Sequence, residues 1–166
     1  IHRIFELWPL LSEDRRMEMA RTVLARQVGQ LDKPTIDELI AGVEQVVRDT
    51  RIAGLFDPAI SHAEVSVMGV LDICGIQRSV TGTIDRMAVT HDAVHLLDFK
   101  TGAHVPRNPE NVPESYVAQL ALYRAIIQQL YPAKPVHATL IWTAARSVER
   151  RVMTIPETML DAAMGA

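Results

Sequence analysis

The sequence predicts an α/β fold, in which a mixed central β-sheet is flanked by helices and preceded by an N-terminal helical segment. Apolar residues recur at helical spacing over the first 50 residues, whereas residues 63 to 99 are rich in short apolar runs typical of strands. A further helix, at residues 114–130, separates the third predicted strand from the fourth. Because a helical crossover can join parallel strands, this order of elements predicts a mixed sheet.

Three helices are predicted in the N-terminal segment. Residues 2–8 form the first and end near Pro9, and Ser12 is placed to cap a second that runs to about Gln27. The sequence TIDE at residues 35–38 has capping-box spacing and predicts a third helix to about Asp49. The apolar residues of this third helix recur at helical spacing and are expected in the core.

Strands are expected after Gly54 and Pro58, which mark the change from helices. The predicted strands span residues 63–70, 79–89 and 93–99 and are expected to be antiparallel neighbours. An exposed loop follows at 102–113, and then the best-defined helix, at 114–130. Strands at 136–143 and 147–154 and a short terminal helix complete the prediction. The buried side of the long helix is predicted to hold Val117, Leu120, Ala121, Ile126 and Ile127.

The chain has 166 residues, 48% of them apolar, which suits a single domain with a substantial core. We expect an N-terminal helical part at 1–52, a core at 53–155 and a C-terminal helix or tail at 156–166, in a domain cut from a longer polypeptide. The lone cysteine, Cys74, excludes an internal disulfide and a four-cysteine iron–sulfur cluster held by this chain alone. No secretory leader or membrane-spanning run is present in these residues, so a cytoplasmic location is expected.

Two of the predicted strands carry acidic residues at their ends. Asp98 and Lys100 alternate with Leu97 and Phe99, so both polar side chains should leave the same face of a strand. Asp85 supplies a second carboxylate from the preceding strand. If the two strands pair, the two acids converge and attract a hard divalent cation, and the lysine can orient or deprotonate a water.

The alternative interpretation is a hairpin with an exposed Asp–Lys pair, and D-x-K alone is common by chance. Lysine is scarce here, at three of 17 basic residues, so Lys100 is not one of many surface lysines. Together with the wider pattern G-x-x-D-R, an apolar run and D-F-K-T-G, this scarcity favours the functional interpretation.

These residues resemble the PD-(D/E)xK nucleases, specifically the RecB-type nuclease domain at the C-terminus of bacterial AddA helicase–nucleases. Asp85 in GTIDR matches the first strand acid of the family, and the sequence DFK at residues 98–100 matches its D-x-K element. The sequence QLALYR at residues 119–124 matches the Q-x-x-x-Y-R helix of the RecB-type branch. His2 looks like the helix histidine that opens the domain, so the similarity runs from there to about Trp142.

The resemblance implies a restriction-endonuclease-like core with Mg²⁺-dependent deoxyribonuclease and exonuclease activity, Mn²⁺ being an alternative metal. It implies catalytic residues Asp85, Asp98 and Lys100, and metal ligation by His2, Asp85, Asp98 and the backbone carbonyl of Phe99. Gln119, Tyr123 and Arg124 are expected to bind substrate or support the site. The absence of further cysteines disfavours the relatives that carry an iron–sulfur cluster.

The resemblance also implies DNA as the partner, as single strands delivered by an ATP-driven helicase during double-strand break repair and recombination. It implies a second, AddB-like subunit. These residues contain no G-x-x-x-x-G-K-[ST] loop, so any motor lies outside them. Two alternatives stay open: a catalytically inactive nuclease fold that docks DNA or protein, and a metal-dependent hydrolase of another phosphate ester.

The remaining charged residues and histidines do not decide the function. A net charge of −3 offers no general attraction for nucleic acid. Glu64 is expected to be a strand residue near the site rather than a ligand, and Arg86 to form a structural salt bridge on the opposite face from Asp85. Surface or turn roles are expected for His91, His95, His104 and His137. Five arginines could line one groove or be dispersed: Arg107, Arg124, Arg146, Arg150 and Arg151.

Overall fold

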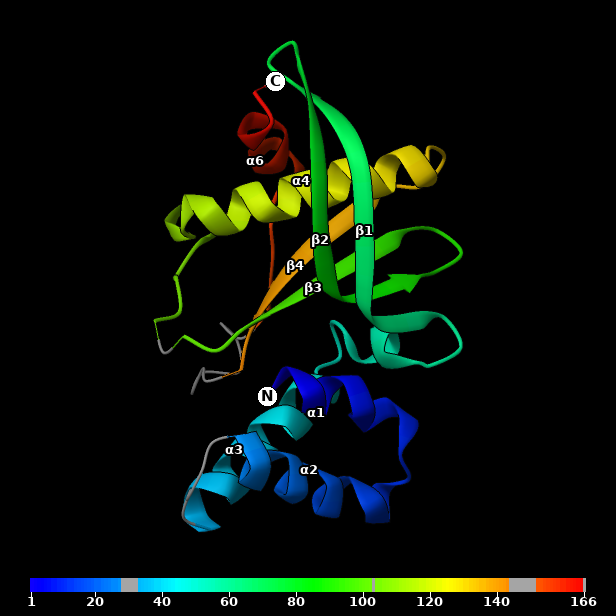
Figure 1. The fold of residues 1–166 in the computed structure, drawn as a ribbon. Coiled ribbons are helices and arrows are strands. Elements are labelled where there is room, and N and C mark those ends of the chain that lie inside the picture. The colour runs from blue at the N-terminus through cyan, green and yellow to red at the C-terminus, as the bar shows by residue number, and fades with distance from the viewer. Residues whose placement is uncertain (28–32, 103, 144–151, 166) are drawn as a thin grey trace.

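In the part of the chain that the structure describes, a mixed sheet of five strands in the order β1-β2-β3-β4-β5 forms the centre of the molecule (Figure 1). The computed structural model describes residues 1–27, 33–102, 104–143 and 152–165. The first three strands are antiparallel neighbours, β4 runs parallel to β3, and β5 is antiparallel to β4. The strands are β1 (Ser61–Ile73), β2 (Ile76–Val89), β3 (Val94–Lys100), β4 (Val136–Trp142) and β5 (Val152–Thr154). The predicted α/β class and the parallel crossover are confirmed.

Helices lie on both faces of this sheet. The N-terminal helices pack at one end of the molecule, and α4 crosses the long β1–β2 hairpin on the other side, with α6 next to it (Figure 1). The helices are α1 (His2–Leu7), α2 (Glu13–Gln27), α3 (Lys33–Val47), α4 (Glu114–Leu130) and α6 (Glu157–Ala163), with 3₁₀ turns η1 (Trp8–Leu10), η2 (Ala53–Phe56) and η3 (Pro109–Asn111). None of the described helices is both long and apolar enough to cross a membrane.

The β1–β2 hairpin is longer than the sequence predicts. Both strands extend to a tight turn at Cys74 and Gly75, whose φ angles of 54° and 77° lie in the left-handed region. The first residues of β2, from Ile76 to Ser79, are all exposed, so they carry no alternation of apolar and polar residues that would identify a strand. Of the predicted strand at 147–154, residues 147–151 lie outside the described part, and 152–154 form β5.

The core is divided between the two faces of the sheet. One cluster packs α4 against residues such as Leu96, Leu140 and Trp142. The other packs the N-terminal helices against Leu97, Phe99 and Ile141 of β3 and β4, with Phe5 of α1 stacked on Phe99 at a centroid distance of 4.2 Å. Since neighbouring residues of β3 enter opposite clusters, this central strand is buried on both faces. The five residues predicted for the buried side of α4 are all buried.

Candidate active site

The end of β3 carries a buried ion pair. Lys100 Nζ lies 2.6 Å from Asp98 Oδ2, and the exposed fractions of the two side chains are only 14% and 7%. The same ammonium donates a hydrogen bond to Gln119 Oε1 at 3.2 Å and lies 4.1 Å from the ring centroid of Tyr116 on α4. Asp98 and Lys100 therefore share a face of β3, and α4 fixes the lysine from above.

The carboxylate of Asp98 is compensated by charge rather than by hydrogen bonds. Its buried Oδ2 accepts no hydrogen bond of regular geometry from any residue the structure describes, although the ammonium of Lys100 is close to it. A buried carboxylate oxygen without donors is costly. Asp98 is therefore an acid held inside the protein with capacity for a further cationic partner.

Asp85 lies across from this pair, where the β2–β3 ladder ends. The last pair of the ladder is Arg86 with Leu97, and continuing this register places Asp85 opposite Asp98. Asp85 Oδ2 accepts a hydrogen bond from the backbone N–H of Phe99 at 2.7 Å. In a strand the N–H and C=O of one residue point to the same side. The carbonyl of Phe99 therefore also points toward the side of Asp85.

The surroundings of Asp85 disfavour its charged form. Burial raises the pKa of Asp85, and the negative charges of Asp98 and Glu64 raise it further. The N–H of Phe99 and the nearby His2 act in the opposite direction and only partly offset this rise in the pKa. An acid whose charge is disfavoured by burial and by other acids gains from a bound cation.

Three side chains come together in a group that suits a metal ion. Ligand atoms of His2, Glu64 and Asp85 all lie within 4.8 Å of one another, and His2 Nδ1 is 3.7 Å from Asp85 Oδ1. Ligands around an octahedral Mg²⁺ are separated by about 3 to 4.2 Å, so small side-chain rotations would suffice. Asp98 is not part of this group, and its Oδ2 lies against Lys100 instead. The donor set of one imidazole and two carboxylates fits Mg²⁺ or Mn²⁺.

Glu64 is a member of the metal-capable group, whereas the sequence predicts only a strand residue near the site. Its φ of 52° is in the left-handed region, and it has no partner in the β1–β2 register, between the pairs Ala63–Arg86 and Val65–Ile84. Such a conformation costs a non-glycine residue on the order of 1–3 kcal/mol and is concentrated at functional sites. His62 and Glu64 lie two apart and make this strand a candidate for a ligand pair, but two-residue alternation predicts neither the register that places Glu64 opposite Asp85 nor the left-handed backbone of Glu64.

The family model of the PD-(D/E)XK nuclease superfamily matches residues 1–161 of the chain. The chain belongs to the PD-(D/E)XK nuclease superfamily. Members are generally nucleases that hydrolyse phosphodiester bonds with divalent metals, so this is a nuclease-type domain with DNA as its implied partner. No curated protein matches the chain. A solved structure described as "Crystal structure of SSO0001" is 16% identical, with a TM-score of 0.38, over 96% of this chain and 71% of that one. A likeness at that TM-score carries no argument.

In this nuclease domain, α4 supports the lysine. Gln119 accepts from Lys100 through Oε1 and donates through Nε2 to Tyr123 Oη at 3.3 Å. Tyr123 in turn lies on the backbone of β2, where a Cβ added to Gly82 would be 2.4 Å from Tyr123 Oη. The glycine of GTIDR is therefore needed for the close approach of α4, and a chain of contacts runs from it to Lys100.

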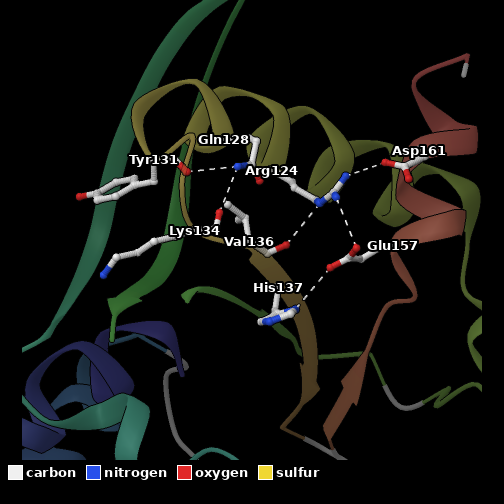
Figure 2. A network of polar contacts seen from close by, with 8 residues as sticks. All are labelled: Arg124, Gln128, Tyr131, Lys134, Val136, His137, Glu157 and Asp161. Carbon is white, nitrogen blue, oxygen red and sulfur yellow. Dashed lines mark hydrogen bonds and ion pairs between the residues drawn. The ribbon is translucent and has the colours of Figure 1, made fainter. Parts of the chain in front are cut away.

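Arg124 contacts α6, the C-terminal helix, whereas Gln119 contacts Lys100. Its guanidinium donates to the carbonyl of Val136 at 3.3 Å and to Asp161 at 2.7 Å, and lies 3.9 Å from Glu157 (Figure 2). Glu157 is also 3.7 Å from His137, so the network links α4, β4 and α6. These contacts brace α6 against α4. Substrate contacts by Gln119, Tyr123 and Arg124 stay predictions.

The other predicted residues fall outside the metal-capable group. Among the described residues, His91, His95, His104 and His137 are not members of it. Arg107 is exposed on the loop before α4, whereas Arg146, Arg150 and Arg151 lie outside the described residues. The salt bridge expected for Arg86 is not present among the described residues: the guanidinium is buried against neutral oxygens instead.

Proposed function

We propose that the chain is the Mg²⁺-dependent deoxyribonuclease domain, and an exonuclease, of an AddA-like helicase–nuclease. One observation supports this proposal most strongly. The group of His2, Glu64 and Asp85 lies next to a buried Asp98–Lys100 pair, in a chain of the PD-(D/E)XK superfamily. The domain thus combines a place for a divalent cation with a lysine beside it, as metal-assisted phosphodiester hydrolysis requires.

The proposed metal ligands are His2, Asp85, Asp98 and the carbonyl of Phe99. Asp85 and the carbonyl of Phe99 lie on the same side of β3, and His2 approaches from α1. Glu64 is a further candidate, since its carboxylate already belongs to the closely spaced group. When bound, Mg²⁺ or Mn²⁺ would lower the pKa of a water and polarise the scissile phosphoryl group.

Lys100 is proposed to orient the attacking water and to stabilise negative charge that develops on the phosphate. Two features of the structure support this role. Gln119 and Tyr116 hold the ammonium from the side of α4, and Asp98 holds it from β3. A lysine with three fixed contacts is already positioned before substrate binds, which is what electrostatic stabilisation of a transition state needs.

The wider context is also a proposal. We propose that single-stranded DNA reaches this site from an attached helicase, with an AddB-like second subunit, in the cytoplasm, during double-strand break repair and recombination. The resemblance of the QLALYR segment to the RecB-type helix supports this branch of the superfamily. The exposed Arg107 on the loop before α4 is available for a phosphate contact.

A cleavage assay on the full-length protein, with single-stranded DNA and Mg²⁺, tests the proposal. Lys100→Ala and Asp98→Ala are each expected to lower the rate by roughly 10²- to 10³-fold, because each removes a charge from the reacting centre. Lys33→Ala is the matched control, since this lysine is exposed at the start of α3 and should leave the rate unchanged. The proposal is wrong if wild type binds DNA without cutting it in Mg²⁺ or Mn²⁺, or if both site variants cut at the wild-type rate.

A small phosphodiester offered in competition with single-stranded DNA separates a nuclease from a hydrolase of another phosphate ester. We expect DNA to be the preferred substrate. A preference for the small ester would mean that the same residues hydrolyse a different class of phosphate ester, and the nuclease proposal would be wrong.

A further inference from the structure

Arg86 is a buried cation on the face of β2 opposite the site. Only 2% of the residue is exposed, and its guanidinium lies over the ring of Phe56, 5.0 Å from the centroid. Burial lowers the pKa of Arg86, and Glu6 partly offsets this effect. Removing an arginine from water without an ion pair is expensive. The two hydrogen bonds that the guanidinium donates offset part of this cost.

One of these contacts repairs a defect in α1. Arg86 Nη2 donates to the carbonyl of Phe5 at 2.8 Å. In a regular helix the N–H of residue 9 would satisfy this carbonyl, but residue 9 is Pro9, which has no N–H. The preceding carbonyl, that of Ile4, receives the N–H of Trp8 as usual. Arg86 therefore takes the place of the missing backbone donor.

The other contact is to the start of β1. Arg86 Nη1 donates to Ser61 Oγ at 2.7 Å, three residues before Glu64. A single guanidinium thus connects α1, β1 and β2. Each of these elements contributes one member of the metal-capable group: His2 from α1, Glu64 from β1 and Asp85 from β2.

We propose that Arg86 is a positioning residue of the metal site, which fixes α1 and β1 on β2 so that His2 and Glu64 meet Asp85. This inference rests on the proposed function, because it assigns a metal to that group. The planar fork of arginine reaches two acceptors in different directions, which a lysine ammonium at the end of a flexible stem does not do in a fixed geometry. The arginine of GTIDR then serves the site without touching it.

The test measures Mn²⁺ binding to the full-length protein by electron paramagnetic resonance, without DNA. Arg86→Met keeps an unbranched, apolar stem, though a shorter one, and removes both hydrogen bonds. Its dissociation constant for Mn²⁺ is expected to rise by about 10-fold or more, as for other residues that orient metal ligands. Val43→Ala removes buried volume from the cluster that packs the N-terminal helices, on α3, and serves as the control for a general loss of thermal stability.

Pro9→Ala provides a rescue that an indirect loss of stability would not predict. Alanine at position 9 supplies the N–H that the Phe5 carbonyl lacks. Pro9→Ala alone should therefore bind Mn²⁺ like wild type, and the double variant Pro9→Ala/Arg86→Met should recover part of the lost affinity.

Three results would overturn the inference: equal Mn²⁺ affinities in wild type and Arg86→Met, an equal loss in Val43→Ala, or no binding of Mn²⁺ by wild type. A wild type that binds Mn²⁺ but does not cut DNA overturns the proposed function instead. In that case the assignment of Arg86 is still decided by the affinities.

Discussion

Replacing Gly82 by alanine should weaken the packing of α4 on β2 and, through α4, the hold on Lys100. The new Cβ would lie 2.4 Å from Oη, 2.5 Å from Cε1 and 2.7 Å from Cζ of Tyr123. These distances are shorter than any real contact of a Cβ, and the ring cannot swing freely, since only 8% of Tyr123 is exposed. Overpacking of this kind costs about 1–3 kcal/mol, and the lower entropy of the unfolded alanine chain returns about 0.4–1 kcal/mol.

The expected net loss is therefore about 1–2 kcal/mol, which corresponds to a fall of roughly 2–8 °C in the thermal midpoint of a domain of this size. Displacing Tyr123 also weakens its contact with Gln119 and hence the hold on Lys100, so we expect about a tenfold loss of nuclease rate. Urea unfolding and single-turnover cleavage measure the two effects on the same samples.

Gly69→Ala is the matched control on the neighbouring strand. There the new Cβ would meet an aliphatic atom of Ile126 at 3.1 Å, a contact that a small side-chain shift relieves. In the double variant Gly82→Ala/Tyr123→Leu the stability should recover relative to Gly82→Ala, while the rate should not, because leucine has no hydroxyl for Gln119. Equal midpoints and rates for the two glycine variants would refute the reasoning.

Three further predictions follow from the electrostatics and the backbone. Because the pKa of Asp85 is raised, its charge destabilises the metal-free fold at neutral pH, and Asp85→Asn should melt at or above the wild-type temperature yet gain nothing from added Mn²⁺. A midpoint several degrees lower without metal would contradict this. Glu64→Gly relieves the strain of a φ of 52° and should stabilise the fold by about 1 kcal/mol in urea unfolding. The same variant should bind Mn²⁺ more weakly in a metal titration. A destabilised variant would show that no strain is stored at Glu64. Burial and His137 lower the pKa of His95, so the unfolded chain binds more protons than the folded one. The contribution of neutral His95 to stability is therefore complete above about pH 6.5 and should fall as the pH drops below that value. His95→Gln should flatten that dependence in urea unfolding at pH 7.5 and 5.5, and an unchanged slope would assign it to other groups.

Much of the fold follows from local patterns in the sequence. The long helix at 114–130 is predicted with both ends correct, because helix-compatible residues run unbroken from Glu114 to Leu130 and Tyr131-Pro132 follows them. The alternation around Asp98 predicts the shared face of that acid and Lys100, since two-residue periodicity is a property of any strand. The parallel pairing of β3 with β4 is predicted because a helix separates them.

What could not be predicted depends on contacts between distant residues. The left-handed backbone of Glu64 lies within the β1–β2 ladder, and no local preference of glutamate favours it. Arg86 bonds a carbonyl 81 positions earlier in the chain, so its role depends on the docking of α1. The pairing of Asp98 with Lys100, and not with the group at Asp85, likewise reflects burial, which spacing alone does not define.

The candidate site has two halves, Asp98 and Lys100 on β3 and His2 on α1, and they differ in how strongly the fold holds them. β3 is buried on both faces, paired with β4 from Val94 to Lys100 and with β2 as far as Leu97, so exposing Asp98 to solvent requires opening of the buried centre of the sheet. The six-residue α1 is too short to be helical on its own, and it depends on its docking against Phe99 and Arg86. Amide hydrogen exchange should therefore be fastest on the His2 side. A cation that bridges both halves would slow this local opening, so occupancy of the metal site and closure of the N-terminal layer are thermodynamically linked.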